Sequence, residues 1–73
     1  MKRDFSEIRF EIETLFLKNK LDIAKTKNIY LPTLDFEVYK EMSEKDGYAL
    51  SWWGIPILET KGTGIFFITE NAR

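Results

Sequence analysis

The stretch that decides the fold is residues 48–68, YALSWWGIPILETKGTGIFFI, which divides into three short apolar runs. The runs span residues 48–53, 55–58 and 65–68. Their aromatic and β-branched residues favour strands. Gly54 marks a tight turn or a bulge after the first run, and a Lys-Gly-Thr-Gly loop precedes the third. Pro56 indicates that its strand lies at a sheet edge or that the irregularity extends through it, because proline cannot donate to a ladder.

Two pairs of adjacent aromatic residues lie in these runs, Trp52-Trp53 and Phe66-Phe67. Because neighbouring strand residues point to opposite faces, each pair places a large side chain on both faces of the sheet. A sheet that is half exposed to water alternates apolar and polar residues instead. If both helices cover one face, one Trp and one Phe remain on the other as a binding or oligomer surface. Alternatively, the helices and loops bury both faces.

Upstream of the strands, the first helix is expected between Asp4 or Ser6, which are both good N-cap residues, and Lys18. With about 100° per residue, one face of this helix forms the core stripe. The stripe contains Phe5, Ile8, Ile12, Leu15 and Phe16. A second apolar group on another side consists of Phe10, Leu17 and Leu21. This group packs under the following loop, forms a second contact surface, or indicates a sandwiched helix that shields the second sheet face.

Residues 28–31, NIYL, predict a short strand that ends at Pro32. A second helix should follow, with Thr33 as N-cap and Gly47 as a left-handed C-cap. Its core stripe contains Leu34, Val38 and Met42. Its acidic residues form an ordinary solvated face, supply the electrostatic half of a protein interface, or mimic a phosphate backbone. The candidates for such an interface are Glu37, Glu41 and Glu44.

The predicted order of elements is αβαβββ, within a single domain that spans residues 1–73. We expect an α+β fold in which two helices pack on a three- to four-stranded, mainly antiparallel sheet. Leu50, Ile57 and one member of each aromatic pair should join the helical stripes in the core. A core this small makes close packing or a partner important for stability.

The chain lacks cysteine and histidine, which excludes disulfides and removes the commonest zinc ligands and catalytic bases. Ser51 has no base near it in sequence, and residues 61–64 lack the spacing of a phosphate-binding loop. The sequence therefore predicts no enzyme, no metal site and no cofactor. No apolar run approaches the roughly 20 residues that span a bilayer, so we expect a cytoplasmic protein without a membrane partner.

Single-stranded nucleic acid is an alternative partner, because such ligands stack bases on sheet aromatics beside basic residues. Residues 61–68, KGTGIFFI, share the glycine frame of the RNA-recognition-motif signature, with Thr63, Ile65 and Ile68 at its aromatic positions. The lysines between 18 and 27 would supply positive charge. The net charge of −1 and the acidic residues of the second helix disfavour a phosphate backbone.

Three short patterns follow one another between residues 29 and 58. They are Ile29-Tyr30-Leu31, a helix that ends Lys45-Asp46-Gly47-Tyr48, and the hairpin Trp53-Gly54-Ile55-Pro56-Ile57. In this order they resemble stretches of tailed-phage structural proteins, although the chain is far too small to be a major capsid protein. The resemblance implies a phage or prophage origin and a related supersecondary unit. Small phage proteins of this kind often bind and modulate a host protein, or decorate a virion.

These features predict a small non-catalytic protein-binding module, a phage-derived inhibitor or modulator of a host protein. The residues expected to bind the partner are Trp52, Trp53, Phe66, Phe67, Glu37, Glu41 and Glu44. The alternative is a structural or assembly protein that acts as a homo-oligomer or as a virion component.

Overall fold

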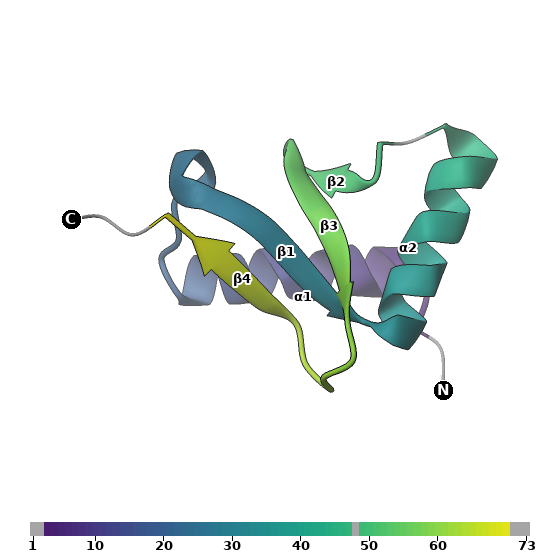
Figure 1. The fold of residues 1–73 in the computed structure, drawn as a ribbon, viewed down its shortest axis with the longest axis horizontal. Helices are drawn as coiled ribbons and strands as arrows, with labels where there is room; N and C mark the ends of the chain where they lie inside the picture. Colours follow the sequence, from purple (N-terminus) through teal and green to yellow (C-terminus); the bar gives the residue numbers. More distant parts are fainter. Residues whose placement is uncertain (1–2, 48, 71–73) are drawn as a thin grey trace.

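The computed structural model describes residues 3–47 and 49–70 of the chain. Along the sequence lie α1 (Phe5–Lys18), the 3-10 helix η1 (Ile23–Lys25), β1 (Thr26–Pro32), α2 (Thr33–Asp46), β2 (Ser51–Trp52), β3 (Ile55–Thr60) and β4 (Phe66–Thr69). Figure 1 shows the strands in one layer, with α1 running behind them and α2 at one end. The α+β class is confirmed, and the order differs from the predicted αβαβββ by η1.

The sheet has the strand order β2-β3-β1-β4 and is mixed. β1 pairs with β3 in parallel, with Ile29 opposite Ile57, whereas β1–β4 and β2–β3 are antiparallel. The prediction of a mainly antiparallel sheet was therefore wrong. The reason is that the connection from β1 to β3 contains α2 and the short β2, which is long enough to return the chain so that β3 runs in the same direction as β1 (Figure 1).

α1 begins at a capping box, in which Asp4 and Glu7 satisfy each other's backbone N–H groups. The Glu7 N–H donates to the Asp4 carboxylate at 2.9 Å, and the Asp4 N–H donates to the Glu7 carboxylate at 3.0 Å. Asp4 is thus the one of the two predicted caps that the helix uses. The buried face carries Ile8, Ile12 and Phe16, in agreement with the predicted stripe.

The buried face of α2 includes Val38 from the predicted stripe but is rotated away from Leu34. Asp35, Val38 and Tyr39 are buried, whereas Leu34 is 47% exposed and lies outside the core. The Asp35 carboxylate turns inward to form an ion pair with the guanidinium of Arg3. This charge-assisted contact favours the observed rotation of α2. The spacing of the apolar residues in the helix does not predict that rotation.

The two ends of α2 differ in how well the sequence predicted them. Pro32 occupies the N-cap position, and the Thr33 hydroxyl donates to the Glu59 carboxylate of β3 at 2.8 Å and makes no cap. The predicted Thr33 cap was therefore wrong. At the other end, Gly47 has a φ of 74°, which confirms the left-handed C-cap.

β2 and β3 form a hairpin whose two-residue turn is Trp53-Gly54, with φ values of 52° and 80°. Positive φ at both positions is the mark of a type I′ turn, which matches the twist of the flanking strands. Gly54 adopts this conformation freely, whereas Trp53 does so at a steric cost. Pairing starts only at Ser51, so β2 is shorter than predicted, and Tyr48 lies outside the described residues.

β3 is an inner strand, so Pro56 does not mark a sheet edge. The Ile57 N–H donates to the Leu50 carbonyl on the β2 side at 3.1 Å, so the adjacent Pro56 nitrogen faces β1. The ladder with β1 begins only at Ile57. Proline is tolerated because it precedes the first residue of that ladder.

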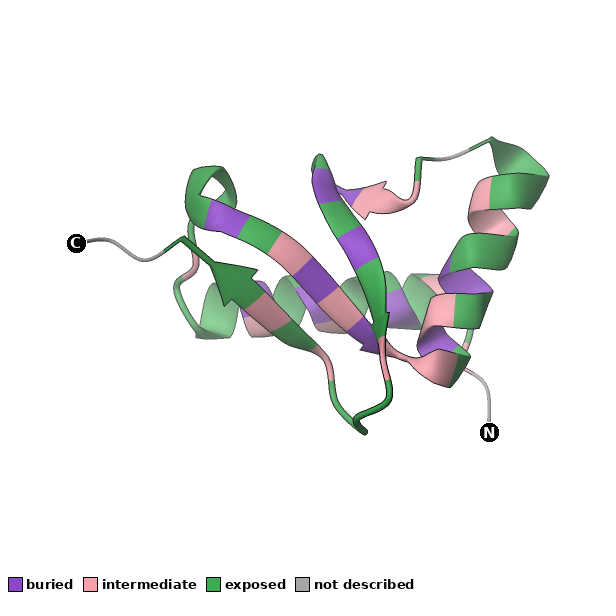
Figure 2. Cartoon of the chain, viewed as in Figure 1, coloured by how far each residue is buried: buried purple, intermediate pink, exposed green. Residues whose placement is uncertain are grey.

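One face of the sheet carries the core, and both helices contribute to it (Figure 2). The buried apolar residues are Ile8, Ile12, Phe16, Ile29, Leu31, Val38, Tyr39, Trp52, Ile55 and Ile57. The Phe16 ring centroid lies 5.2 Å from that of Trp52 and 5.8 Å from that of Phe67, which joins α1 to the sheet. Three residues predicted for the core are only half-buried, namely Leu15, Met42 and Leu50.

Candidate protein-binding surface

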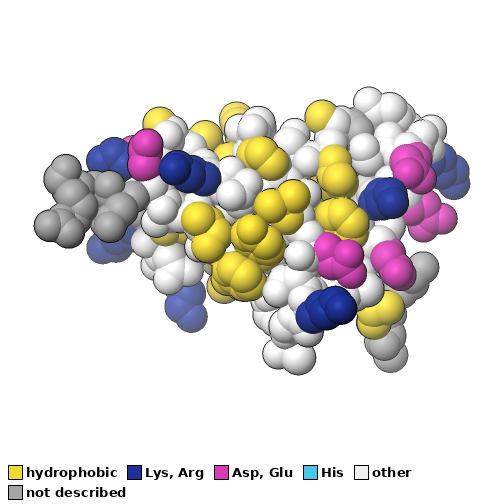
Figure 3. All heavy atoms as spheres, viewed as in Figure 1, with side chains coloured by type: hydrophobic (Ala, Val, Ile, Leu, Met, Phe, Trp, Pro, Cys, Tyr) yellow, Lys and Arg dark blue, Asp and Glu magenta, His cyan; other side chains and the backbone are white. Residues whose placement is uncertain are grey.

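The sheet face that points away from the helices is largely apolar, with the polar Asn28 opposite Ile68. It carries Tyr30, Leu58, Phe66 and Ile68, and we call these four residues the open face. Tyr30 stands opposite both Leu58 on β3 and Phe66 on β4. Its ring stacks on that of Phe66, with centroids 4.8 Å apart and planes 6° from parallel. Figure 3 shows apolar side chains gathered near the centre of this side of the molecule.

The open face keeps much of its apolar surface in contact with water. Leu58, Phe66 and Ile68 are 38%, 42% and 41% exposed. A sheet face that remains solvated normally carries polar side chains. Contiguous exposed apolar residues of this kind are typical of a contact surface. Since β1 pairs with β3 on one side and with β4 on the other, the backbone holds these side chains in fixed relative positions.

The four predicted aromatic residues do not form one site. Trp52 is 5% exposed and belongs to the core, and Phe67 is half-buried against that core. Phe66 lies on the open face. Trp53 is 70% exposed, but it occupies the hairpin turn beside α1 and lies outside the open face. Each pair thus divides between interior and surface, and the exposed members lie on different surfaces.

Sequence reasoning missed the contribution of Tyr30 and Leu58 to this surface. A signal was present, because Tyr30 alternates with the buried Ile29 and Leu31, and Leu58 follows the buried Ile57. The missing information was the strand order, which places β1 between β3 and β4 and so brings Tyr30 beside Phe66 and Leu58.

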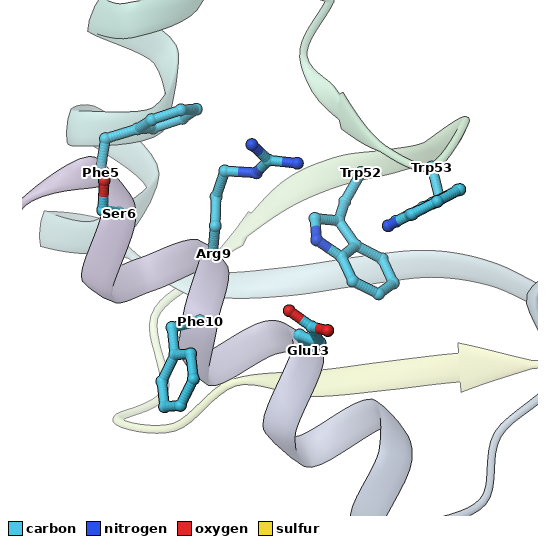
Figure 4. Close-up of a pocket in the computed structure, with 7 residues that line it drawn as sticks. All are labelled: Phe5, Ser6, Arg9, Phe10, Glu13, Trp52 and Trp53. Atoms are coloured by element: carbon cyan, nitrogen blue, oxygen red, sulfur yellow. The ribbon is translucent and has the colours of Figure 1, made fainter.

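A hollow of about 360 Å³ lies between α1 and the β2–β3 turn. In Figure 4, Arg9 extends from α1 between Phe5 and Trp52, with its guanidinium carbon 5.7 Å from the centroid of the Phe5 ring. Phe10 and Leu17, from the second apolar group of α1, are 70% and 67% exposed. α1 is therefore not sandwiched between two layers.

A second hollow, of about 430 Å³, lies between α1 and β4, and we call it the edge groove. α1 and the residues after it supply Leu15, Asn19 and Leu21, and β4 supplies Phe67 and Thr69. Phe66 also lines the groove, so the groove adjoins the open face at the outer side of the sheet.

Charge is distributed unevenly along the chain. Residues 18–27, from the end of α1 into β1, carry the exposed residues Lys18, Lys20, Lys25 and Lys27. α2 carries the exposed residues Glu37, Glu41 and Glu44. α2 also carries two exposed lysines, Lys40 and Lys45. Figure 3 shows most of the visible acidic side chains on the α2 side of the apolar patch. Within residues 3–47 and 49–70, the ion pairs are those of Arg3 with Glu11 and Asp35.

The polar contacts inside the fold support its architecture. The Tyr39 hydroxyl donates to the Ser51 carbonyl at 2.9 Å and so ties α2 to β2. Burial raises the pKa of Tyr39 above its usual value, while the charge of Arg9 and a hydrogen bond with Arg9 lower this pKa.

In the part of the chain that the structure describes, no three acidic side chains are placed to hold a metal ion.

No helix among the described residues is long and apolar enough to cross a bilayer. Comparison of the chain with protein-family models, with curated proteins and with solved structures finds no match.

Proposed function

We propose that the chain is a small non-catalytic protein-binding domain and that the open face is its contact surface. The observation that carries this proposal is the stacked Tyr30–Phe66 pair with Leu58 beside it, on paired strands that neither helix covers. Aromatic anchors dominate many protein interfaces, because they bury a large area with few rotatable bonds. A partner that covers this face would remove apolar surface from water, at roughly 25 cal/mol per Å².

The partner we propose is a host protein that the chain binds stoichiometrically, as the resemblance to tailed-phage proteins implies. The exposed residues Glu37, Glu41 and Glu44 of α2 would add a charged contact that speeds association. Reversing these three charges to lysine should weaken binding most at low salt, where screening is least. Unchanged binding and unchanged salt dependence would remove α2 from the proposed surface.

Capture of host proteins by the full chain tests the open face. Phe66→Ser and Leu58→Ser each remove one side chain from it, and Leu17→Ser removes an apolar, exposed side chain from α1 as the matched control. Loss of an anchor commonly weakens an interface by about 2 kcal/mol, or roughly 30-fold in affinity. We expect the proteins that the wild type captures to be lost with both open-face variants and retained with Leu17→Ser.

Capture that survives both open-face substitutions would contradict the proposal. Urea unfolding curves identify any variant that has lost its fold. Sedimentation over a range of concentrations tests the alternative function, in which the chain acts as a homo-oligomer. An oligomer that Phe66→Ser dissociates, in a chain that captures no host protein, would assign the open face to self-association.

A further inference from the structure

We infer that the partner contributes an extended, carboxylate-rich strand that pairs with the free edge of β4. This inference rests on the proposed function and names the part of the partner that binds. β4 lies at the outer edge of the sheet, beyond β1. An edge strand offers a row of backbone N–H and C=O groups that another extended backbone can satisfy as a ladder.

The outward backbone groups of β4 belong to Phe67 and Thr69. The Glu70 N–H donates to the Lys25 carbonyl at 2.6 Å, on the β1 side. Because hydrogen-bonding groups alternate along a strand, those of Ile68 also point toward β1, and those of Thr69 and Phe67 point away from the sheet. The four residues of β4 include no proline and no charged residue, which are features that usually block an edge.

Both sides of this edge can receive the alternating side chains of an added strand. On the helix side lies the edge groove, with Leu15, Leu21 and Phe67 in its wall. On the other side, Phe66 and Ile68 carry the open face out to the edge. An added strand would place one set of side chains in the groove and the other set against the open face, since strand side chains alternate in direction.

The charge around the edge groove favours an acidic strand. Lys18 and Lys20 flank Asn19, which lines the groove, and Lys25 adjoins the end of β4 because its carbonyl accepts the Glu70 N–H. These three lysines are exposed and form no ion pair within the described residues. Two exposed acidic residues, Asp22 and Glu70, adjoin Lys25 through backbone hydrogen bonds, so lysines outnumber carboxylates here by three to two. Carboxylates on the incoming strand would supply the missing counter-charges, and complementary potentials also steer association.

A second copy of the chain matches this edge less well. Its own β4, Phe66–Thr69, contains no carboxylate, so pairing of two β4 strands would leave the lysines without counter-charges.

Synthetic peptides and the full chain test the inference by fluorescence anisotropy. The probe is a fluorescein-labelled peptide of about ten residues in which valine and glutamate alternate, long enough to extend beyond both ends of β4. A second peptide carries lysine in place of glutamate. We expect the glutamate peptide to bind saturably and the lysine peptide to bind at least about tenfold more weakly.

A matched pair of substitutions tests the backbone itself. Thr69→Pro removes an outward N–H and retains the donors of the β1 ladder, whereas Thr69→Val keeps the N–H and a side chain of similar size. We expect peptide binding to fall about tenfold with Thr69→Pro and to change by less than about twofold with Thr69→Val. In the wild-type chain, the glutamate peptide should also slow hydrogen exchange at the Phe67 and Thr69 amides, which requires no substitution.

The inference is overturned if the glutamate peptide does not bind, if the lysine peptide binds equally well, or if the Phe67 and Thr69 amides stay unprotected in the complex. A dimer of the chain that Thr69→Pro dissociates would assign the edge to a second copy and would also overturn it. If only this inference is wrong, Phe66→Ser still abolishes host-protein capture and Thr69→Pro does not affect it. If the proposed function itself is wrong, Phe66→Ser does not affect host-protein capture.

Discussion

Removing the hydroxyl of Tyr39 should loosen the contact between α2 and β2. Tyr39→Phe deletes the 2.9 Å hydrogen bond to the Ser51 carbonyl, while the ring can keep its position 4.8 Å from that of Phe5. Tyr39 is 2% exposed, so water cannot easily replace the lost donor. A hydrogen bond of this kind contributes about 1 kcal/mol to the free energy of unfolding, which in a domain of this size corresponds to roughly 4–8 °C in Tm.

Tyr30→Phe is the matched control for this substitution. It removes the same hydroxyl from a half-buried tyrosine on the open face, outside the core. The free energy of unfolding should then change by less than about 0.5 kcal/mol. Urea unfolding followed by tryptophan fluorescence measures both variants, because Trp52 is buried against Phe16 and becomes exposed on unfolding.

The burial of Tyr39 predicts how the stability of the wild type depends on alkaline pH. Burial raises the pKa of Tyr39 in the folded chain, whereas an unfolded tyrosine ionises near pH ~10. The contribution of this group is fully present below that pH and is lost as the pH rises through the folded-state pKa, because the unfolded chain then binds fewer protons. The stability difference between the wild type and Tyr39→Phe should therefore shrink as the pH rises above about 10.

Two results would refute this reasoning. One is a Tyr39→Phe variant as stable as Tyr30→Phe at neutral pH, which would mean that the hydrogen bond to Ser51 contributes nothing measurable. The other is a difference between wild type and Tyr39→Phe that stays constant into the alkaline range, which would mean that burial does not raise the pKa.

Two further substitutions test local features of the fold. Trp53→Asn should raise the free energy of unfolding by about 0.5–1 kcal/mol, because asparagine adopts a φ of 52° more readily than tryptophan. A urea curve that shows a loss would mean that the contact of Trp53 with Trp52, 6.2 Å between ring centroids, outweighs the relief of strain. Arg3→Met should cost about 1 kcal/mol, because it leaves the buried Asp35 carboxylate without its ion pair. Adding Asp35→Asn should recover part of that loss, and a double variant no more stable than Arg3→Met would contradict this account.

Several elements follow from interactions that are local in the chain. The capping box of Asp4 and Glu7, the spacing of the α1 core stripe and the C-cap at Gly47 all depend on residues within a few positions of one another. The same holds for the turn at Gly54, where the backbone needs a positive φ. These interactions form inside single elements, so the amino-acid sequence alone determines them.

Contacts between segments that are distant in the chain assemble the surface that we propose to be functional. The pairing of β1 with both β3 and β4 places Tyr30 between Leu58 and Phe66, and Tyr30 lies far from both of these residues in the chain. The ion pair of Arg3 with Asp35 likewise accompanies a rotation of α2 that the apolar stripe does not indicate. The sequence predicted that each aromatic pair would place a large side chain on both sides of its strand, which holds for Phe66-Phe67 in β4, whereas Trp53 lies in the turn that follows β2. Only the tertiary structure decided which of these side chains meet on the open face, because strand order depends on packing across the whole domain and not on the periodicity of any one segment.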